Sequence, residues 1–216
     1  MTTYKHIEIV RHGKTAEVWL SRPQSRNAIN REMLLELLDC LNSLAADSAL
    51  HALLIRGRGP VFCAGADLKW MGQEDASDSE GPDQWLGKLF HALYRFPAPV
   101  IMVVHGRVMG GGMGIMACGD IILAEEDTLF CFPETRLGLI PATISPYIVQ
   151  RSGKAAALSL MLFARDFSSE EALRCGLIDK RIREEFLEEH LEILRTTLQE
   201  NAPLAMRSCK KLIHNL

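Results

Sequence analysis

The sequence HGRVMGGGMGIMACGDIILAEEDTLFCFPE, residues 105–134, holds the features on which the expected fold and site depend. The apolar run before it, residues 99–104, predicts a buried strand. Three consecutive glycines at 110–112 then lead into an apolar segment, residues 115–118, that suits the start of a buried helix. A strand that joins a helix through glycines presents unpaired backbone N–H groups where the helix begins. The stretch therefore predicts a site for an anion, or for an oxygen that becomes negative during a reaction.

A single carboxylate closes this stretch. Residues 129–132 form another apolar segment of strand type, and Pro133 and Glu134 follow it directly. An acid between a hydrophobic strand and a turn is expected to be partly buried, and burial raises the pKa of a carboxyl. Such a group is suited to proton transfer, so Glu134 is a candidate catalytic residue. The alternative is an exposed glutamate in a surface salt bridge.

The composition is that of a soluble globular protein. The 216 residues suffice for one domain with a sizeable core, with 48% apolar and 24% charged residues. Acids and bases are interspersed and the net charge is −3, which predicts neither a nucleic acid nor a membrane surface as partner. The six cysteines form no CxxC pair and lie mostly in apolar runs, which favours reduced cysteines and a cytoplasmic location. The N-terminus does not resemble a signal peptide, and no apolar run approaches the about 20 residues of a membrane helix.

Short strands alternate with helices along the chain, which predicts an α/β domain with largely parallel strand pairing. Residues 6–10 and 16–20 alternate between apolar and polar and predict a hairpin, and Asn30 is placed to cap a helix. Residues 61–65 predict a strand that breaks at Gly65 and runs into a short helix. A strand is expected at 52–55, a mobile surface loop at 72–83 and a helix at 85–96. A further helix is capped by Ser145 and ended by Gly153, and a buried helix follows at 154–162. The capping box at 168–171 opens a helix that ends near Gly176, and a helical stretch at 184–216 is broken at 202–203.

Several kinds of site are not favoured by the sequence. The seven histidines form no HxxxH or HxH pair, so no metal site is predicted. No GxSxG motif supports a Ser-His-acid triad. Ile115 stands where a dinucleotide-binding GxGxxG motif needs its third glycine.

Three motifs in this order and spacing resemble the crotonase (enoyl-CoA hydratase/isomerase) superfamily, and the resemblance covers nearly the whole chain. It implies an α/β fold, a spiral of ββα units followed by C-terminal helices. It also implies an acyl-CoA thioester substrate, no cofactor beyond the coenzyme A of that substrate, and a homotrimer or a dimer of trimers. Residues 1–199 are then the crotonase core domain and residues 200–216 the start of a C-terminal helical segment, which we expect to be truncated at Leu216. The motifs are Phe62-Cys-Ala-Gly-Ala-Asp-Leu68, Gly106-Arg-Val-Met-Gly-Gly-Gly112 with Asp120, and Pro133-Glu-Thr-Arg-Leu-Gly-Leu139.

The resemblance also implies the residues of the site. The family's oxyanion hole falls on the backbone N–H groups of Ala66 and Gly111, and Glu134 matches one of its two catalytic glutamates. Two convergent N–H donors stabilise the negative charge that collects on a thioester oxygen. The residues implied to contact the substrate, mainly its adenine and pantetheine, are Arg26, Ala28, Ala64, Asp67, Leu68 and Gly110.

The sequence departs from the family pattern at Gly114, where typical hydratases carry a second glutamate. With Glu134 alone, the simplest reaction is a proton shuttle between C2 and C4, as in a Δ3-Δ2 enoyl-CoA isomerase. Residues 136–147, however, are similar to the branch that hydrates 3-methylglutaconyl-CoA and isohexenylglutaconyl-CoA. This similarity implies a hydratase that adds water to the 2,3 double bond of a 3-branched glutaconyl-type thioester, with the substrate's own carboxylate helping to place the water. Other crotonase chemistry, such as decarboxylation or polyketide dehydration, and a non-catalytic CoA-binding or scaffolding protein remain open alternatives.

Overall fold

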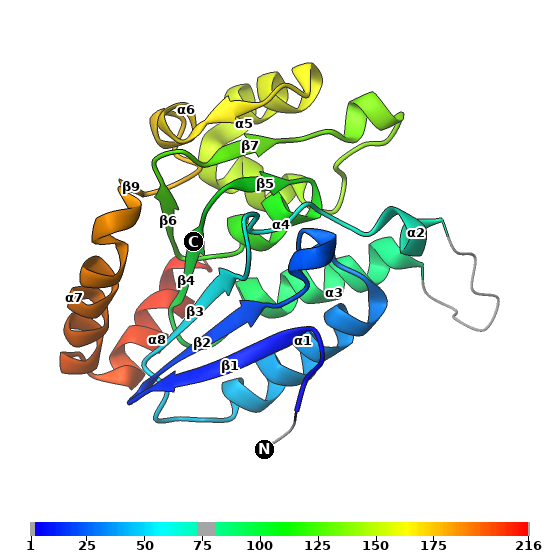
Figure 1. Cartoon of the computed structure of the whole chain (residues 1–216). Coiled ribbons are helices and arrows are strands. Elements are labelled where there is room, and N and C mark those ends of the chain that lie inside the picture. The colour runs from blue at the N-terminus through cyan, green and yellow to red at the C-terminus, as the bar shows by residue number, and fades with distance from the viewer. Residues whose placement is uncertain (1–2, 73–80, 216) are drawn as a thin grey trace.

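A sheet of six strands lies at the centre of the computed structural model, which describes residues 3–72 and 81–215 (Figure 1). Strand β1 (Ile7–His12) pairs antiparallel with β2 (Thr15–Leu20), which confirms the expected hairpin. All other neighbours in this sheet pair in parallel, as the alternation of strands and helices predicts. The order is β1-β2-β3-β4-β6-β9, where the further strands are β3 (Ala52–Gly57), β4 (Val100–Val104), β6 (Ile121–Glu125) and β9 (Lys180–Ile182).

Two layers of helices cover the two faces of this sheet. Alternate residues of β3 point to opposite faces, so Leu53 packs in the larger hydrophobic core and Leu54 in the smaller one. The larger core contains α1 (Arg31–Ala45) and α3 (Pro82–Tyr94), and the smaller one contains α7 (Leu187–Glu200). The fold is therefore α/β, with the sheet buried between helices.

The glycine-rich stretch contains one strand more than the sequence analysis expects. After β4, residues 105–106 turn the chain into β5 (Arg107–Met109), and Gly110 then leads into α4 (Gly111–Ala117). Strand β5 belongs to a second, three-stranded sheet with β7 (Leu129–Cys131) and β8 (Phe167–Ser168). This small sheet sets the glycines beside Glu134, because β7 runs parallel to β5 and ends just before Pro133.

Several local signals act as expected. The Asn30 side chain accepts a hydrogen bond from the Met33 N–H and caps α1, and Ser168 caps α6 (Ser169–Arg174) through the Glu171 N–H. Gly153, with φ 74°, interrupts α5 (Ser145–Phe163). The C-terminal stretch is helical and is broken before Pro203, where α8 (Pro203–Ile213) begins.

Four local expectations are wrong in whole or in part. Residues 154–162 are helical but not buried as a whole, because only Ala157 and Leu160 among them are buried while Leu158 and Leu162 are exposed. Residues 61–67 form no strand, because only isolated bridges connect them to their neighbours. Ser145 does not cap α5, since its hydroxyl donates instead to the Pro141 carbonyl at 2.5 Å. Most of the expected loop at 72–83, residues 73–80, is not among the described residues. The last two residues of that range, Pro82 and Asp83, already belong to α3.

The C-terminal helix α8 is tied to residues just before β4 and β6 by one ion pair and one hydrogen bond. The Lys210 ammonium donates to the Asp120 carboxylate at 2.6 Å and to the Ala98 carbonyl at 3.2 Å. Within residues 3–72 and 81–215, no helix has the length and apolar character needed to span a bilayer. The division into residues 1–199 and 200–216 stays a prediction.

Candidate active site

A cavity of about 380 Å³ opens between α2 (Leu68–Met71), α3, α4 and the segment after β7. It brings together parts of the chain that are far apart in sequence. The predicted site residues that line this cavity are Ala64, Ala66, Leu68, Gly110, Gly111 and Glu134. The three predicted residues that do not line it are Arg26, Ala28 and Asp67.

The two predicted oxyanion donors, Ala66 and Gly111, lie against each other. A Cβ added to Gly111 would be 3.3 Å from the Ala66 nitrogen, and one added to Gly65 would be 3.3 Å from the Gly111 nitrogen. In the described part of the chain, neither N–H donates to a backbone carbonyl. Gly65 has φ 100° and Gly110 has φ 48°. Residues other than glycine rarely adopt these backbone conformations. Glycine is thus needed here both for the backbone conformation and for the close approach of the donors.

The carboxyl group of Glu134 reaches the same place. Its Oε1 atom lies 3.3 Å from the position of a Cβ on Gly110. Its Oε2 atom is buried and has no hydrogen-bond partner among the described residues. Burial raises the pKa of the Glu134 carboxyl above the ordinary value of 4.5, as the sequence analysis expects. A proton-transfer group with an unused oxygen therefore stands beside two unused N–H donors.

The space next to Gly114 is filled by hydrocarbon. A Cβ at this position would lie 2.5 Å from Cγ2 of Ile144 and 2.6 Å from Cζ of Phe90. Both side chains are buried and line the cavity, so they stand between Gly114 and any ligand. A side chain at this position, where the family resemblance implies a second glutamate, thus requires Phe90 or Ile144 to move.

Substituting Gly114→Ala is expected to destabilise the protein by about 1–3 kcal/mol, because the added methyl group overpacks the core. The helical Gly87 provides a matched control, since a Cβ there meets only Cγ2 of Thr143 at 3.6 Å. Gly87→Ala should leave the free energy of unfolding unchanged or raise it by up to about 1 kcal/mol, because alanine has a higher helix propensity than glycine. Urea unfolding of both variants measures the two free energies, and equal stabilities would contradict the tight packing at Gly114.

The other walls of the cavity are mostly apolar. Among the described residues that line it, none is a lysine, arginine or histidine. Asp83 supplies a second carboxyl, which is exposed at the first turn of α3. The sequence does not indicate Asp83 as a site residue, because residues 72–83 have the composition of a loop. The remaining apolar wall residues include Met71, Leu86, Leu137, Leu139 and Ile140.

The three predicted residues outside the cavity support the loop that carries Ala66. The carbonyl of Arg26 accepts a hydrogen bond from the Ala64 N–H at 3.0 Å, and the Arg26 side chain is exposed. The carbonyl of Ala28 accepts a hydrogen bond from the Arg22 guanidinium. The Asp67 carboxylate accepts from the Lys69 N–H at 3.1 Å and so caps α2. Their contacts with coenzyme A stay predictions.

Comparison with known proteins identifies the family. The family profile described as enoyl-CoA hydratase/isomerase matches residues 11–215. The chain belongs to this family. Its fold is accordingly the crotonase spiral of ββα units, and the protein is an enzyme of the enoyl-CoA hydratase/isomerase family, whose members act on acyl-CoA thioesters.

Relatives with named activities and solved structures match most of the chain. A crotonyl-CoA hydratase of Syntrophomonas wolfei is 30% identical, with 96% of this chain and 80% of the relative covered. A 2,3-dehydroadipyl-CoA hydratase of Escherichia coli is 28% identical over 90% of this chain and 76% of the relative. The structure of AtuE from Pseudomonas aeruginosa is similar with a TM-score of 0.92 and 34% identity, covering 97% of this chain and 83% of that one.

Proposed function

We propose that this enzyme adds water to the 2,3 double bond of an enoyl-CoA thioester, with Glu134 as the acid–base residue. The observation that carries the proposal is the unpaired, buried carboxyl oxygen of Glu134 beside the free N–H groups of Ala66 and Gly111. A protein that only bound coenzyme A would gain nothing from a buried carboxyl at this position, because burying it without a partner costs free energy.

In the proposed reaction the thioester oxygen accepts hydrogen bonds from the two donors. Water attacks C3 while the Glu134 carboxylate takes its proton, and the electrons of the double bond move onto the thioester oxygen as an enolate. Glu134 then returns the proton to C2, and the hydroxyl remains on C3. By comparison with other oxyanion holes, each donor contributes about 3 kcal/mol to stabilising the enolate. Every atom of the water ends in the product, so no cofactor is needed beyond the coenzyme A of the substrate.

The proposed substrate is a 3-branched glutaconyl-type thioester. Its distal carboxylate would take the role of the second acid, for which there is no room at Gly114. No described residue lining the cavity is cationic, so this carboxylate would not be neutralised there. An unpaired carboxylate is costly to strip of water, so it would carry a bound water into the cavity, and this water is the one proposed to attack C3. The apolar walls suit the branch at C3.

A specific observation also favours a second candidate, the isomerisation of a Δ3-enoyl-CoA. Phe90 and Ile144 fill the space next to Gly114, and a reaction that moves one proton from C2 to C4 or back needs only Glu134. The same two backbone donors would stabilise its dienolate.

Labelled water separates the two candidates. In water containing ¹⁸O, hydration of a 3-branched glutaconyl-CoA should yield a product that is heavier by one water and carries the label at C3. Isomerisation leaves the mass of the substrate unchanged and introduces no label. We expect little or no label with straight-chain crotonyl-CoA, which has no distal carboxylate. Efficient hydration of crotonyl-CoA, followed by product mass and by the loss of enoyl absorbance, would contradict substrate assistance.

The proposed role of Glu134 also predicts a pH dependence. The carboxylate form takes the proton, so kcat/KM should fall as the pH drops through the pKa of Glu134. Burial raises this pKa, and the acidic limb should therefore lie above the 4.5 of an ordinary glutamate. An acidic limb at or below that value would show that the group is not the buried carboxyl of Glu134.

We propose a homotrimer or a dimer of trimers in the cytoplasm, without nucleic acid or membrane as partner. Exposed apolar side chains near the end of α5 support contacts between subunits, with Leu158 61%, Leu162 63% and Phe163 70% exposed. Sedimentation velocity measures the state of assembly directly.

A further inference from the structure

The segment that carries Ala66 lacks the support of a regular strand. On one side, the isolated bridge between Cys63 and Val108 joins residues 61–67 to β5. On the other side, the segment lies along residues 22–30 and forms a second isolated bridge at Ala66. The position of the Ala66 N–H therefore depends on how firmly residues 22–30 are held.

Ile29 sets the direction of this N–H. The Ile29 N–H donates to the Gly65 carbonyl at 2.8 Å, and the Asp67 N–H donates to the Ile29 carbonyl at 2.8 Å. These two bonds lie on either side of Ala66. Because successive residues of an extended chain point their amides to opposite sides, the Ala66 N–H faces away from Ile29, toward Gly111.

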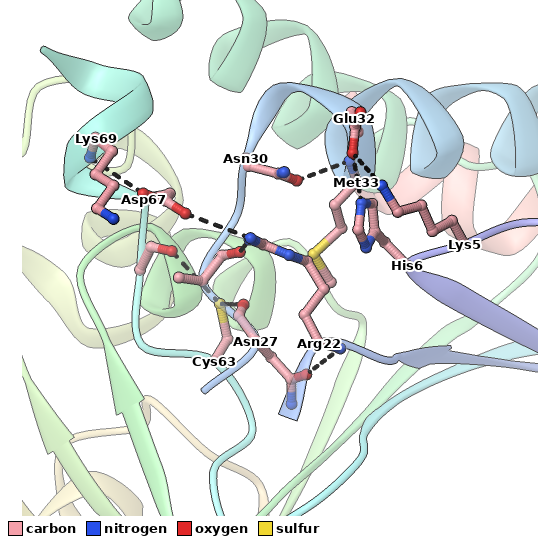
Figure 2. Close-up of polar contacts among 12 residues, drawn as sticks. Lys5, His6, Arg22, Asn27, Asn30, Glu32, Met33, Cys63, Asp67 and Lys69 are labelled. Atoms are coloured by element: carbon pink, nitrogen blue, oxygen red, sulfur yellow. Dashed lines mark hydrogen bonds and ion pairs between the residues drawn. The ribbon is translucent and has the colours of Figure 1, made fainter. Parts of the chain in front are cut away.

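A buried arginine, Arg22, connects the two segments that meet at the Ile29–Ala66 bridge (Figure 2). Arg22 is 9% exposed, and its guanidinium donates to the Ala28 carbonyl, directly before Ile29, and to the Asp67 carboxylate at 3.5 Å. The other oxygen of Asp67 accepts from the Lys69 N–H, so the same side chain caps α2. Arg22 thus ties residues 28 and 67 together around the Ile29–Ala66 bridge.

Arg22 itself is held by Asn27. The Arg22 N–H donates to the Asn27 side-chain oxygen at 2.8 Å. The Asn27 amide group donates to the carbonyls of Arg58 and Val61, both at 2.8 Å. Asn27 is fully buried, so these bonds are shielded from water. Asn27 fixes the beginning of the 61–67 segment, and Arg22 fixes its end at Asp67.

We propose that Arg22 is a positioning residue for the oxyanion donor Ala66 and acts through Asp67. Neither side chain lines the cavity, so neither is expected to touch the acyl group or the reacting atoms. The proposal rests on the proposed function, because it assigns Ala66 to the stabilisation of a charged thioester oxygen. Loss of the contact between Arg22 and Asp67 should then reduce the stabilisation of the transition state more than the affinity for the substrate.

The variant Arg22→Met retains an unbranched side chain of similar length and removes both hydrogen bonds. We expect kcat to fall by about tenfold to hundredfold with KM within about threefold, as for small displacements of a catalytic group. Arg22→Lys should recover part of kcat, because one ammonium can reach one of the two acceptors but lacks the fork of the guanidinium. Arg151→Met is a matched control: the Arg151 side chain is 14% exposed and pairs with Asp179 at 2.6 Å, outside the cavity, and its loss should leave kcat unchanged.

An infrared difference spectrum of a bound enoyl-CoA with a ¹³C-labelled thioester carbonyl tests the mechanism directly. The wild-type enzyme should shift the carbonyl stretch to lower frequency, and the shift should be smaller in Arg22→Met at equal occupancy. An absent shift in the wild type would overturn the oxyanion hole itself. A normal shift and normal kcat in folded Arg22→Met would overturn only the positioning role. If Arg22→Met does not fold, Asp67→Asn repeats both measurements, because asparagine caps helices as well as aspartate but lacks the charge.

Discussion

Glu134→Gln is expected to lower kcat by about 10²–10⁴-fold, the usual contribution of general acid–base catalysis, while the dissociation constant of the CoA ester stays within about threefold. The amide has nearly the shape of the carboxyl but cannot accept the proton. Glu134 is the acid that stands beside the two donors, and Gly114 offers no room for another. Stopped-flow turnover and calorimetric binding of a product ester measure the two effects separately.

Glu125→Gln provides the control for this substitution. Burial also raises the pKa of Glu125, but this residue lies on β6 and does not line the cavity. Its variant should keep wild-type kcat, which would separate the effect of position from the effect of a raised pKa. More than about a tenth of wild-type activity in Glu134→Gln would be incompatible with a proton-transfer role of the expected size.

Gly111→Pro should reduce kcat by about 10²–10³-fold, as expected for the loss of one oxyanion donor. The substitution removes the N–H while the backbone carbonyl remains. Gly111 is the first residue of α4, where proline is compatible with a helix. The proline Cβ would lie 3.3 Å from the Ala66 nitrogen, so a shift of this second donor adds to the loss. KM should change less than kcat, since the donor matters most when the oxygen is charged.

The comparison for Gly111→Pro has to be made per folded molecule. Circular dichroism and urea unfolding give the folded fraction, by which the measured kcat is corrected. The carbonyl shift of a bound enoyl-CoA should also decrease. If the folded variant keeps the kcat of the wild type, Gly111 is not an oxyanion donor.

The features that sequence reasoning predicted are those encoded by neighbouring residues. The hairpin β1–β2 follows from alternation over a few positions, and the caps at Asn30 and Ser168 follow from side chains that reach an N–H three residues away. Glu134 was predicted correctly as a partly buried acid, because the apolar residues before it and the turn after it lie in the same stretch. The positions of Ala66 and Gly111 came from the family resemblance, and the geometry brings both to one cavity.

The features that were missed depend on residues far apart in the chain. Phe90 lies in α3, and Ile144 directly precedes α5. Only the folded chain brings these two side chains to Gly114. Residues 61–65 have the composition of a strand, but their backbone bonds go to residues 22–30 and to β5 through single bridges. No pattern in the sequence indicates a pair such as Arg22 and Asp67, 45 positions apart.

The filled space at Gly114 constrains how this enzyme can evolve. One base change can turn a glycine codon into a glutamate codon, so a second acid is close in the genetic code. This substitution should cost stability, because the new side chain would meet Ile144 and Phe90. A smaller residue at one of these two positions would make room for the glutamate, but that change alone opens a cavity that also costs stability. The two substitutions are thus epistatic, and the order in which they occur decides whether a lineage of this enzyme can pass from one acid to two.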